Sequence, residues 1–174
     1  MEKEAMCLKE KKEITVVGAA IIDVLVGPVN ERVFQTGSLA CEMSRLSFGG
    51  DALNEAVVLS RLGASVQLLT KVGKDEAGER VVDYVLANGL GTEYIQQEEG
   101  LQTGMNIVLI DDHGERHFLT NPNSSLRKLS KEDILPYVEE MGDIVSFASI
   151  FVSHELDIPA MEEVFRKIKN KKGR

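Results

Sequence analysis

A stretch of glycine, carboxylate and amide residues stands at the start of an amphipathic segment, SFGGDALNEAVVLSRLGA, residues 47–64. Gly49 and Gly50 lack side chains, so a ligand can approach their backbone closely. Asp51 and Asn54 offer a carboxylate and an amide, which could hydrogen-bond adjacent hydroxyls of a polyol. The alternative is structural: Asp51 caps the helix that follows, and Asn54 is merely solvated. The residue types alone leave both interpretations open.

Asp23 is a second polar residue at a position where ligands bind in α/β proteins. It ends an apolar, β-branched run, Ile14–Ile22, which is typical of a strand buried on both faces. The carboxyl ends of such strands are where ligands bind, although an aspartate there can equally cap a turn. If the two segments face one crevice, Asp23, Asp51 and Asn54 form a polar triplet suited to a sugar rather than to an anion.

The segments around these residues alternate between strand and helix patterns. A helix is predicted over 52–62 with Gly63 as its left-handed stop, followed by a strand over 66–69. Asp75 can cap a second helix that Gly89 ends. The buried stripe of that helix is predicted to comprise Val81, Val82, Val85 and Leu86. This βαβα order predicts a parallel α/β sheet.

Two other segments carry patterns typical of antiparallel strands. Residues 31–48 show alternation, and residues 94–120 contain two strand-like runs, 105–110 and 115–120, joined by the hairpin loop DDHG. Two such insertions could pair into one small sheet. At the carboxyl ends of the core strands, that sheet would cover the ligand crevice as a lid.

The last third of the chain returns to the α/β pattern. Ser130 and Asp133 could form a capping pair for a helix through Met141, and a buried strand is predicted over 144–147. A final helix follows, with Pro159 in its first turn. The predicted organisation is a flexible terminus over residues 1–12 and one partial α/β domain over residues 13–174.

Composition limits the possible partners. The chain has 174 residues, 43% hydrophobic content and a formal net charge of −8, which argues against binding to nucleic acid or an anionic membrane. Two cysteines cannot build a disulfide framework, so we expect a reducing, cytoplasmic location. The apolar run before Val29 is interrupted by Asp23 and is too short to span a bilayer.

These residues together resemble the PfkB carbohydrate kinases of the ribokinase-like superfamily. The stretch VVGAAIIDVLV resembles the family's first strand, which ends in a substrate-binding aspartate, here Asp23. TGMNIVLIDDHGERHFLT resembles its lid strands. The first family signature is matched by Gly49, Gly50, Ala52, Asn54, Ala56, Gly63 and Gly73. The resemblance runs from about residue 13 to the end of the chain. It implies a Rossmann-like parallel-sheet core with helices on both faces and a small antiparallel β lid.

In that family a sugar lies between core and lid, and its hydroxyl receives the γ-phosphoryl group of ATP, with Mg²⁺. The resemblance implies that Asp23 and Asp51 hold sugar hydroxyls, that the backbone of Gly49 and Gly50 contacts the sugar, and that Asn54 binds it. Four further residues are implied to approach it: Met105, Arg116, Phe118 and Glu155. The position of Asp51 varies in the family and is lysine in ribokinase, so the sugar need not be ribose.

One part of the family pattern is missing. The Gly-Ala-Gly-Asp segment that supplies the catalytic base does not occur in this sequence, and no GxxxxGK[ST] loop replaces it. The resemblance therefore covers an amino-terminal portion only: the base is expected beyond Arg174, the carboxy-terminal part of the core is absent, and this chain alone is predicted to be inactive. Two alternatives stay open: a sugar-binding regulatory module, and a dimerising pseudo-kinase. A homodimer through the lid strands is expected for the kinase and for both alternatives.

Overall fold

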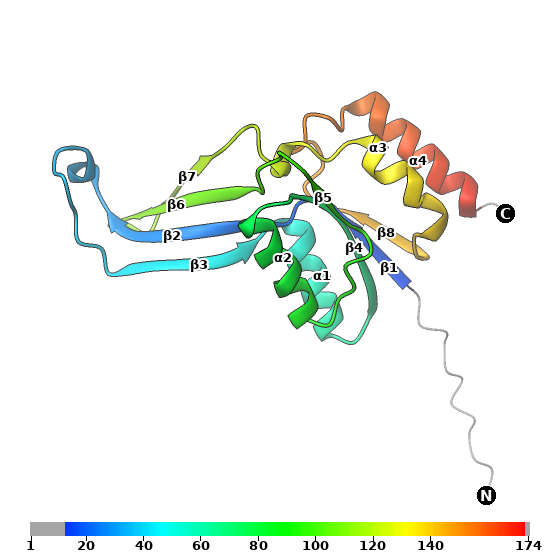
Figure 1. Cartoon of the computed structure of the whole chain (residues 1–174), viewed down its shortest axis with the longest axis horizontal. Coiled ribbons are helices and arrows are strands. Elements are labelled where there is room, and N and C mark those ends of the chain that lie inside the picture. Colours follow the sequence, from blue (N-terminus) through cyan, green and yellow to red (C-terminus); the bar gives the residue numbers. More distant parts are fainter. Residues whose placement is uncertain (1–12, 173–174) are drawn as a thin grey trace, which may run out of the picture.

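The computed structural model describes residues 13–172, which form two four-stranded sheets (Figure 1). The predicted flexible terminus, residues 1–12, lies outside the described residues. The first sheet, here called the core sheet, is entirely parallel in the order β5-β4-β1-β8. Its strands are β1 (Glu13–Val17), β4 (Ser65–Gly73), β5 (Ile95–Glu98) and β8 (Ile144–Phe147). The predicted parallel α/β sheet is confirmed.

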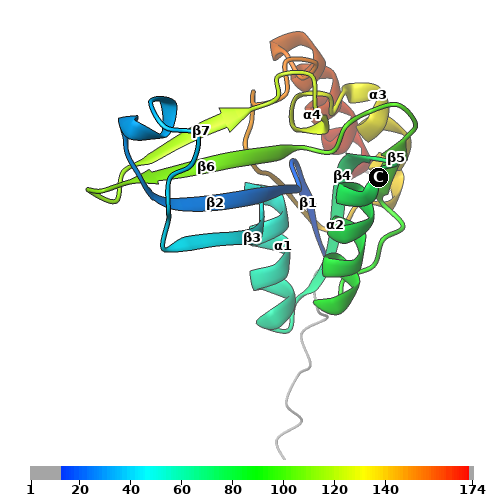
Figure 2. The same ribbon diagram turned by 60° about the vertical axis from the view of Figure 1, so that its left-hand side comes forward.

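The second sheet, here called the outer sheet, extends away from the core sheet in the order β3-β2-β6-β7 (Figures 1 and 2). Its strands are β2 (Ile21–Val29), β3 (Met43–Gly49), β6 (Met105–Asp111) and β7 (Arg116–Thr120). The β6–β7 pair is antiparallel, as predicted. The segments 31–48 and 94–120 share this sheet, but β2 lies between them, antiparallel to β3 and parallel to β6. Both central strands follow the carboxyl ends of core strands, so they run outward together while β3 and β7 border them in the opposite direction.

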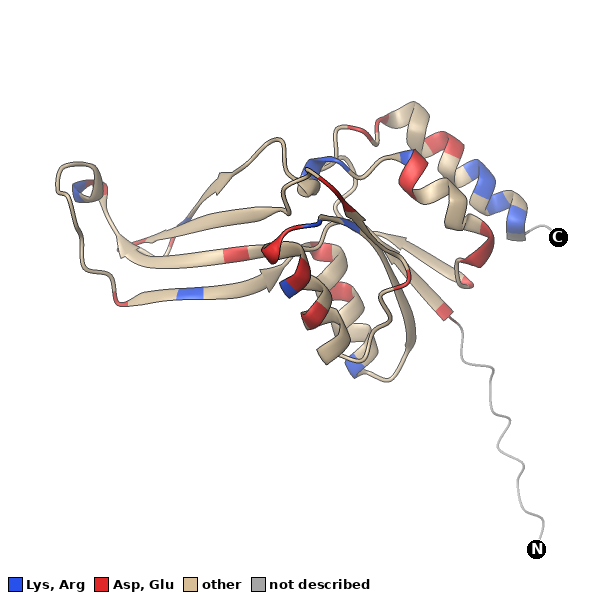
Figure 3. Ribbon diagram, in the orientation of Figure 1, with Lys and Arg blue, Asp and Glu red and all other residues tan. Residues whose placement is uncertain are grey.

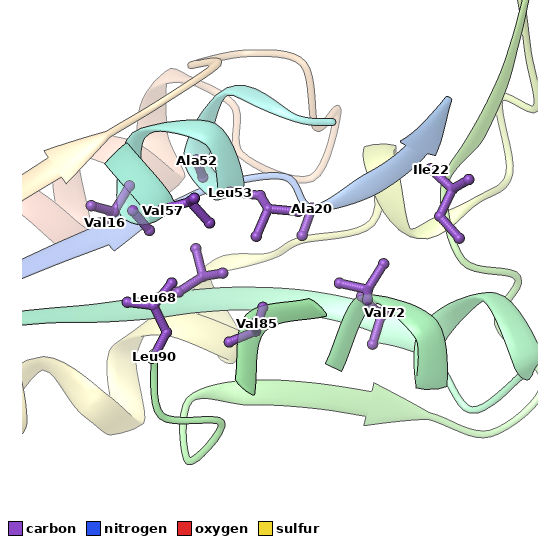
Figure 4. Close-up of a cluster of buried hydrophobic side chains, with 12 residues drawn as sticks. Val16, Ala20, Ile22, Ala52, Leu53, Val57, Leu68, Val72, Val85 and Leu90 are labelled. Carbon is purple, nitrogen blue, oxygen red and sulfur yellow. The ribbon is translucent and has the colours of Figure 1, made fainter. Parts of the chain in front are cut away.

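Helices cover the two faces of the core sheet (Figure 1). The helices of one face are α1 (Asp51–Arg61) and α2 (Glu76–Ala87); those of the other are α3 (Lys131–Ile134), the 3₁₀ helix η3 (Leu135–Glu140) and α4 (Ile158–Lys172). Strand side chains alternate between them. Val16 and Leu68 join the cluster under α1 and α2 (Figure 4), whereas Val17 and Leu69 join the one under α3 and α4. No helix within residues 13–172 is both long and apolar enough to cross a membrane.

The predicted single strand over residues 14–22 is wrong. It is two strands in two sheets, because β1 ends at Val17 and the chain bends through Gly18–Ala20 before β2 begins at Ile21. The sequence stays apolar across the bend because Ala20 and Ile22 are buried in the same cluster as β1. Asp23 is therefore the third residue of an outer-sheet strand and does not end a core strand.

Several predicted element bounds also change. The segment 31–48 begins with the 3₁₀ helix η1 (Glu31–Phe34), and only its last part is a strand. Residues 95–98 belong to the core sheet as β5. In α2, Leu86 is 54% exposed and not part of the buried stripe, because the helix rests on the sheet through Gly78, Val81 and Val85.

A predicted side-chain cap and a predicted turn are confirmed. Ser130 and Asp133 form a capping box before α3, but the predicted helix through Met141 is the four-residue α3 followed by the 3₁₀ helix η3, which ends at Glu140. In the DDHG turn, the carboxylate of Asp111 accepts hydrogen bonds from the backbone N–H groups of Glu115 and His113. The hydrogen bond from the Glu115 N–H is the main reason why the pKa of Asp111 is lowered. The 3₁₀ helix η2 (Ser125–Arg127) lies between β7 and α3.

Asp75 caps α2, as predicted, and also joins the helix to the segment before β6. Its Oδ1 accepts hydrogen bonds from the Gly78 N–H (2.8 Å) and the Thr103 hydroxyl (2.6 Å), and its Oδ2 accepts one from the Thr103 N–H (2.9 Å). Burial alone would raise the pKa of Asp75, but these hydrogen bonds outweigh it and lower that pKa below its usual 3.8.

Replacing Asp75 with asparagine is expected to lower the free energy of unfolding by about 1–2 kcal/mol at pH 7, because an amide donor then faces the donor N–H of Thr103. Since the folded-state pKa is lowered, the stabilisation is present above the usual aspartate pKa and is lost as pH falls through the folded value. Urea unfolding of both proteins should therefore show a difference that shrinks as the pH falls below the usual aspartate pKa of 3.8. Asp83→Asn, an exposed position on α2, is the matched control. An equal loss in the two variants would contradict the expectation.

Candidate sugar-binding site

A row of polar side chains crosses the outer sheet close to the core. The strand register places Ser47, Asp23, Asn106 and Thr120 side by side. The Asn106 amide donates to Asp23 Oδ1 (2.9 Å), and the Thr120 hydroxyl donates to Asn106 Oδ1 (2.8 Å). Asn106 is only 7% exposed, so these two hydrogen bonds fix its orientation. Within residues 13–172, the second oxygen of Asp23 accepts no hydrogen bond and remains available.

Gly49 lies directly against this carboxylate. A β-carbon built on Gly49 would be 2.2 Å from Asp23 Oδ2, so any side chain there would take the space that the carboxylate occupies. The glycine that the sequence places before α1 therefore gives Asp23 its position. The next residue, Gly50, is the N-cap of α1, and its backbone turns the chain from the outer sheet into the helix.

Asp51 is the first residue of α1 and does not cap it. No side chain caps this helix, so the structural alternative for Asp51 is wrong. Its carboxylate instead accepts a hydrogen bond of 2.5 Å from the hydroxyl of Ser149, which follows β8. Asn54 is exposed one turn along the helix. The contact with Ser149 places Asp51 at the carboxyl end of β8, whereas no side-chain contact places Asn54 beside Asp23.

Sequence reasoning missed Ser149 and Asn106. Ser149 adopts a positive φ of 57°, and Phe151 in the same loop has a φ of 68°, a conformation that costs energy for residues other than glycine. Such strain is concentrated at functional sites. The serine in the segment FASIF carries no motif that would have singled it out. Asn106 could have been found only from the register that pairs it with Asp23.

The two faces of the outer sheet differ. The Asp23 face is the side to which Asp23, Asn106 and every second residue along their strands point, together with the residues paired with them on β3 and β7. The Met105 face is the opposite side. On the Asp23 face Val108 is 3% exposed and its neighbour Phe118 57%, whereas Met105 and Ile107 on the other face are 39% and 43% exposed.

The structure brings some of the remaining candidates to the Asp23 face and leaves others elsewhere. Phe118 and Arg116 lie on the Asp23 face, farther from the core. Met105 points to the opposite face, because it is adjacent to Asn106 in the strand. Glu155 pairs with Lys128 at 3.1 Å, and both side chains are partly exposed.

The arrangement is suited to binding hydroxyl groups. It offers a carboxylate with a free oxygen, an oriented amide, glycine backbone and a second carboxylate, which together can bind a polyhydroxylated molecule. Within the described part of the chain, no group of three or more histidine, cysteine, aspartate or glutamate residues could hold a metal ion. These residues form a candidate binding site for such a molecule.

The fold and site define an α/β protein with a row of polar side chains on a second sheet beside its core. Comparison with known sequences gives the family: the profile described as pfkB family carbohydrate kinase matches residues 11–173. The chain belongs to this family. It is 36% identical over 83 residues to 2-dehydro-3-deoxygluconokinase of Haemophilus influenzae, covering 45% of this chain and 26% of that protein. It is 31% identical over 117 residues to fructosamine kinase FrlD of Bacillus subtilis, covering 65% and 40%.

Solved structures agree with this assignment and with the ribokinase-like fold. The crystal structure of fructokinase from Xylella fastidiosa superposes with a TM-score of 0.74 at 25% identity, covering 92% of this chain and 48% of that one. The structure of the same enzyme with bound ATP gives a TM-score of 0.73. The chain thus spans about half the length of these solved kinases, and less than half of the two curated relatives above.

Proposed function

We propose that this chain provides the sugar-binding part of an ATP-dependent carbohydrate kinase. The observation that carries the proposal is the carboxylate of Asp23, oriented by Asn106 and accommodated by Gly49, with one oxygen free. Asp23 and Asp51 accept hydrogen bonds from sugar hydroxyls, and Asn54 adds an amide. The backbone of Gly49 and Gly50 lies against the bound sugar. The relatives' names, which refer to fructose, fructosamine and 2-dehydro-3-deoxygluconate, support a sugar or sugar acid as the ligand.

The outer sheet acts as a lid in this proposal. Its Asp23 face covers the sugar, with Phe118 supplying an apolar contact, while Arg116 lies on the same face but too far from Asp23 to contact a small sugar. Ser149 holds the Asp51 carboxylate by a hydrogen bond. Met105 contributes to the opposite face, and Glu155 remains a candidate only if its pairing with Lys128 opens.

The Met105 face supports the proposed homodimer. Four apolar side chains on it, Leu46, Met105, Ile107 and Leu119, are 39–56% exposed. An exposed apolar patch of this kind is typical of a protein–protein interface. Pairing two outer sheets through these faces would bury it and leave the Asp23 face for the ligand. The exposed free thiol of Cys41 fits a reducing compartment such as the cytoplasm.

ATP and Mg²⁺ are proposed as the cofactors of the complete kinase. Structures of two relatives, the Xylella fructokinase and the sugar kinase PH1459, contain ATP. The proposal assigns no described residue to the nucleotide, since they form no cluster of three or more metal-binding side chains and the sequence has no phosphate loop. When bound, Mg–ATP supplies the phosphoryl group; this chain binds and orients the acceptor.

The 174-residue chain is expected to bind sugars but to transfer no phosphoryl group from ATP to them. Phosphoryl transfer requires electrostatic stabilisation of the moving group and a base for the hydroxyl, and the Gly-Ala-Gly-Asp segment expected to supply that base does not occur in this sequence. Calorimetric titration with a sugar panel, followed by an assay with radiolabelled ATP, measures the two properties separately. A complete fructokinase assayed in parallel is the positive control.

Each outcome of that experiment distinguishes the candidate functions. Sugar binding without transfer supports the proposal, and addition of a separate ATP-binding chain that restores transfer would strengthen it. Phosphorylation by the purified chain alone would overturn the predicted inactivity. If no sugar binds, the sugar-site proposal fails and a purely dimerising role, carried by the Met105 face, is favoured.

A further inference from the structure

Three charged side chains share the Asp23 face within the strands of the outer sheet, and two of them are arginines. The register pairs Arg45 with Leu25 and Arg116 with Ile110, which places both arginines on the same side as Asp23. Figure 3 shows that most of the outer sheet is uncharged. Among the described residues, neither guanidinium has a hydrogen bond or an ion pair, and both side chains are exposed. In a chain with a net charge of −8, two unpaired cations on one face call for an explanation.

Arg45 is close enough to serve a ligand held by Asp23. It lies on the neighbouring strand, two residues outward from Ser47, the residue opposite Asp23. With strands about 4.8 Å apart and a two-residue repeat of about 6.8 Å, its Cα is about 8 Å from that of Asp23. An extended arginine side chain covers this distance. Arg116 is two strands away and farther out, about 17 Å by the same geometry, beyond the reach of a small sugar.

The surroundings of Arg45 favour an anion over a neutral group. Leu25 beside it is 9% exposed, and Val108 on the next strand is 3% exposed, so the face between them is apolar. Neither of these side chains offers the guanidinium a hydrogen-bond acceptor. The planar guanidinium also matches the two oxygens of a carboxylate or phosphate group. A neutral sugar would leave the donor groups of Arg45 without a charged partner.

We propose that the ligand is an anionic sugar, one that carries a carboxylate or a phosphate group, and that Arg45 binds the anionic group. The inference rests on the proposed function, because Asp23 must first hold the sugar hydroxyls. The triplet of Asp23, Asp51 and Asn54 suits hydroxyls only, so the anion is bound one row farther from the core. Arg45 thereby determines specificity within the class of sugars that the polar row can bind.

The experiment compares matched charged and uncharged ligands on the 174-residue chain. Calorimetric titrations use 2-dehydro-3-deoxygluconate and its uncharged methyl ester for the carboxylate, and D-fructose 6-phosphate and D-fructose for the phosphate. In at least one pair the anionic member should bind about 10-fold or more tightly than its uncharged partner. Arg45→Gln should remove that preference and change the affinity for the uncharged member by less than about twofold. Higher salt should weaken binding of the anionic member alone.

Arg166→Gln on α4 is the control, because it makes the same charge change far along the chain from the outer sheet. Equal affinities within both pairs would overturn the inference and leave the proposed function standing. So would an Arg45→Gln variant that weakens charged and uncharged ligands alike, since Arg45 would then act on the fold. Binding of none of the four ligands would overturn the proposed function itself. The pair that shows the preference identifies the anion as carboxylate or phosphate.

Discussion

Replacing Asp23 with alanine is expected to weaken sugar binding by about 100-fold or more, while the protein still folds. The lost carboxylate would accept two charge-assisted hydrogen bonds from the sugar, each worth about 1.5–3 kcal/mol. The variant leaves the Asn106 amide without its partner at 2.9 Å, so a loss of about 1 kcal/mol in the free energy of unfolding accompanies the change. Calorimetric titration with the tightest-binding sugar measures the first effect, and urea unfolding measures the second.

Asp112→Ala is the matched control for this experiment. Asp112 lies in the turn after β6, and among the described residues its carboxylate accepts a 3.3 Å hydrogen bond from the Asn30 amide. The substitution therefore removes the same charge at the far end of the same sheet. The control should bind sugar like the unchanged protein. Unaltered sugar binding by the Asp23→Ala variant would show that the polar row is not the site. Asp23→Asn, which keeps the shape of the side chain, should have a sugar affinity between those of the Asp23→Ala and Asp112→Ala variants.

Gly50→Ala is expected to cost about 3 kcal/mol or more in the free energy of unfolding. Gly50 has a φ of 93°, and a β-carbon there would lie 2.3 Å from the carbonyl oxygen of Ala19. That oxygen belongs to the backbone of the bend between the two sheets, so it cannot move aside without displacing β2 from the core. The cost combines the conformational penalty of a positive φ with a backbone clash.

Gly63→Ala separates these two contributions. Gly63 has a similar φ of 83° after α1, but a β-carbon there meets nothing within 4 Å. It should therefore cost only about 1 kcal/mol, the conformational penalty alone. Thermal or urea unfolding of both variants gives the difference. Equal losses would show that the backbone around Ala19 yields, and that the junction between the sheets is less rigid than its geometry indicates.

Local signals in the sequence predicted much of the fold. The cap at Asp75, the box at Ser130 and Asp133, and the DDHG turn each depend on residues three or four positions apart. Such contacts are set by local backbone geometry, so the residue types suffice to find them. The parallel order of the core followed because strand and helix patterns alternate along the chain.

What the sequence could not reveal depends on long-range register. The bend at Gly18 has no hydrophobicity signal, because Val17 before it and Ile22 after it are equally buried. The pairing of Asp23 with Asn106 joins residues 83 positions apart. That Met105 and Asn106 point to opposite faces follows only once the pairing of β6 with β2 is known. The candidate site was therefore predicted by residue type, but its partners and its faces were not.

The position of β1 in the middle of the core sheet affects how the chain folds as the ribosome makes it. One edge of β1 pairs with β4. The other edge pairs with β8, with Ile144 beside Ile14, so it stays unpaired until β8 has been synthesised. The outer sheet is complete at Thr120, and the stretch from there to Ile144 takes roughly one to five seconds to synthesise. During that interval one edge of β1 stays unpaired while the outer sheet is already complete. Nascent chains of this protein therefore offer chaperones a defined strand edge to protect until β8 emerges.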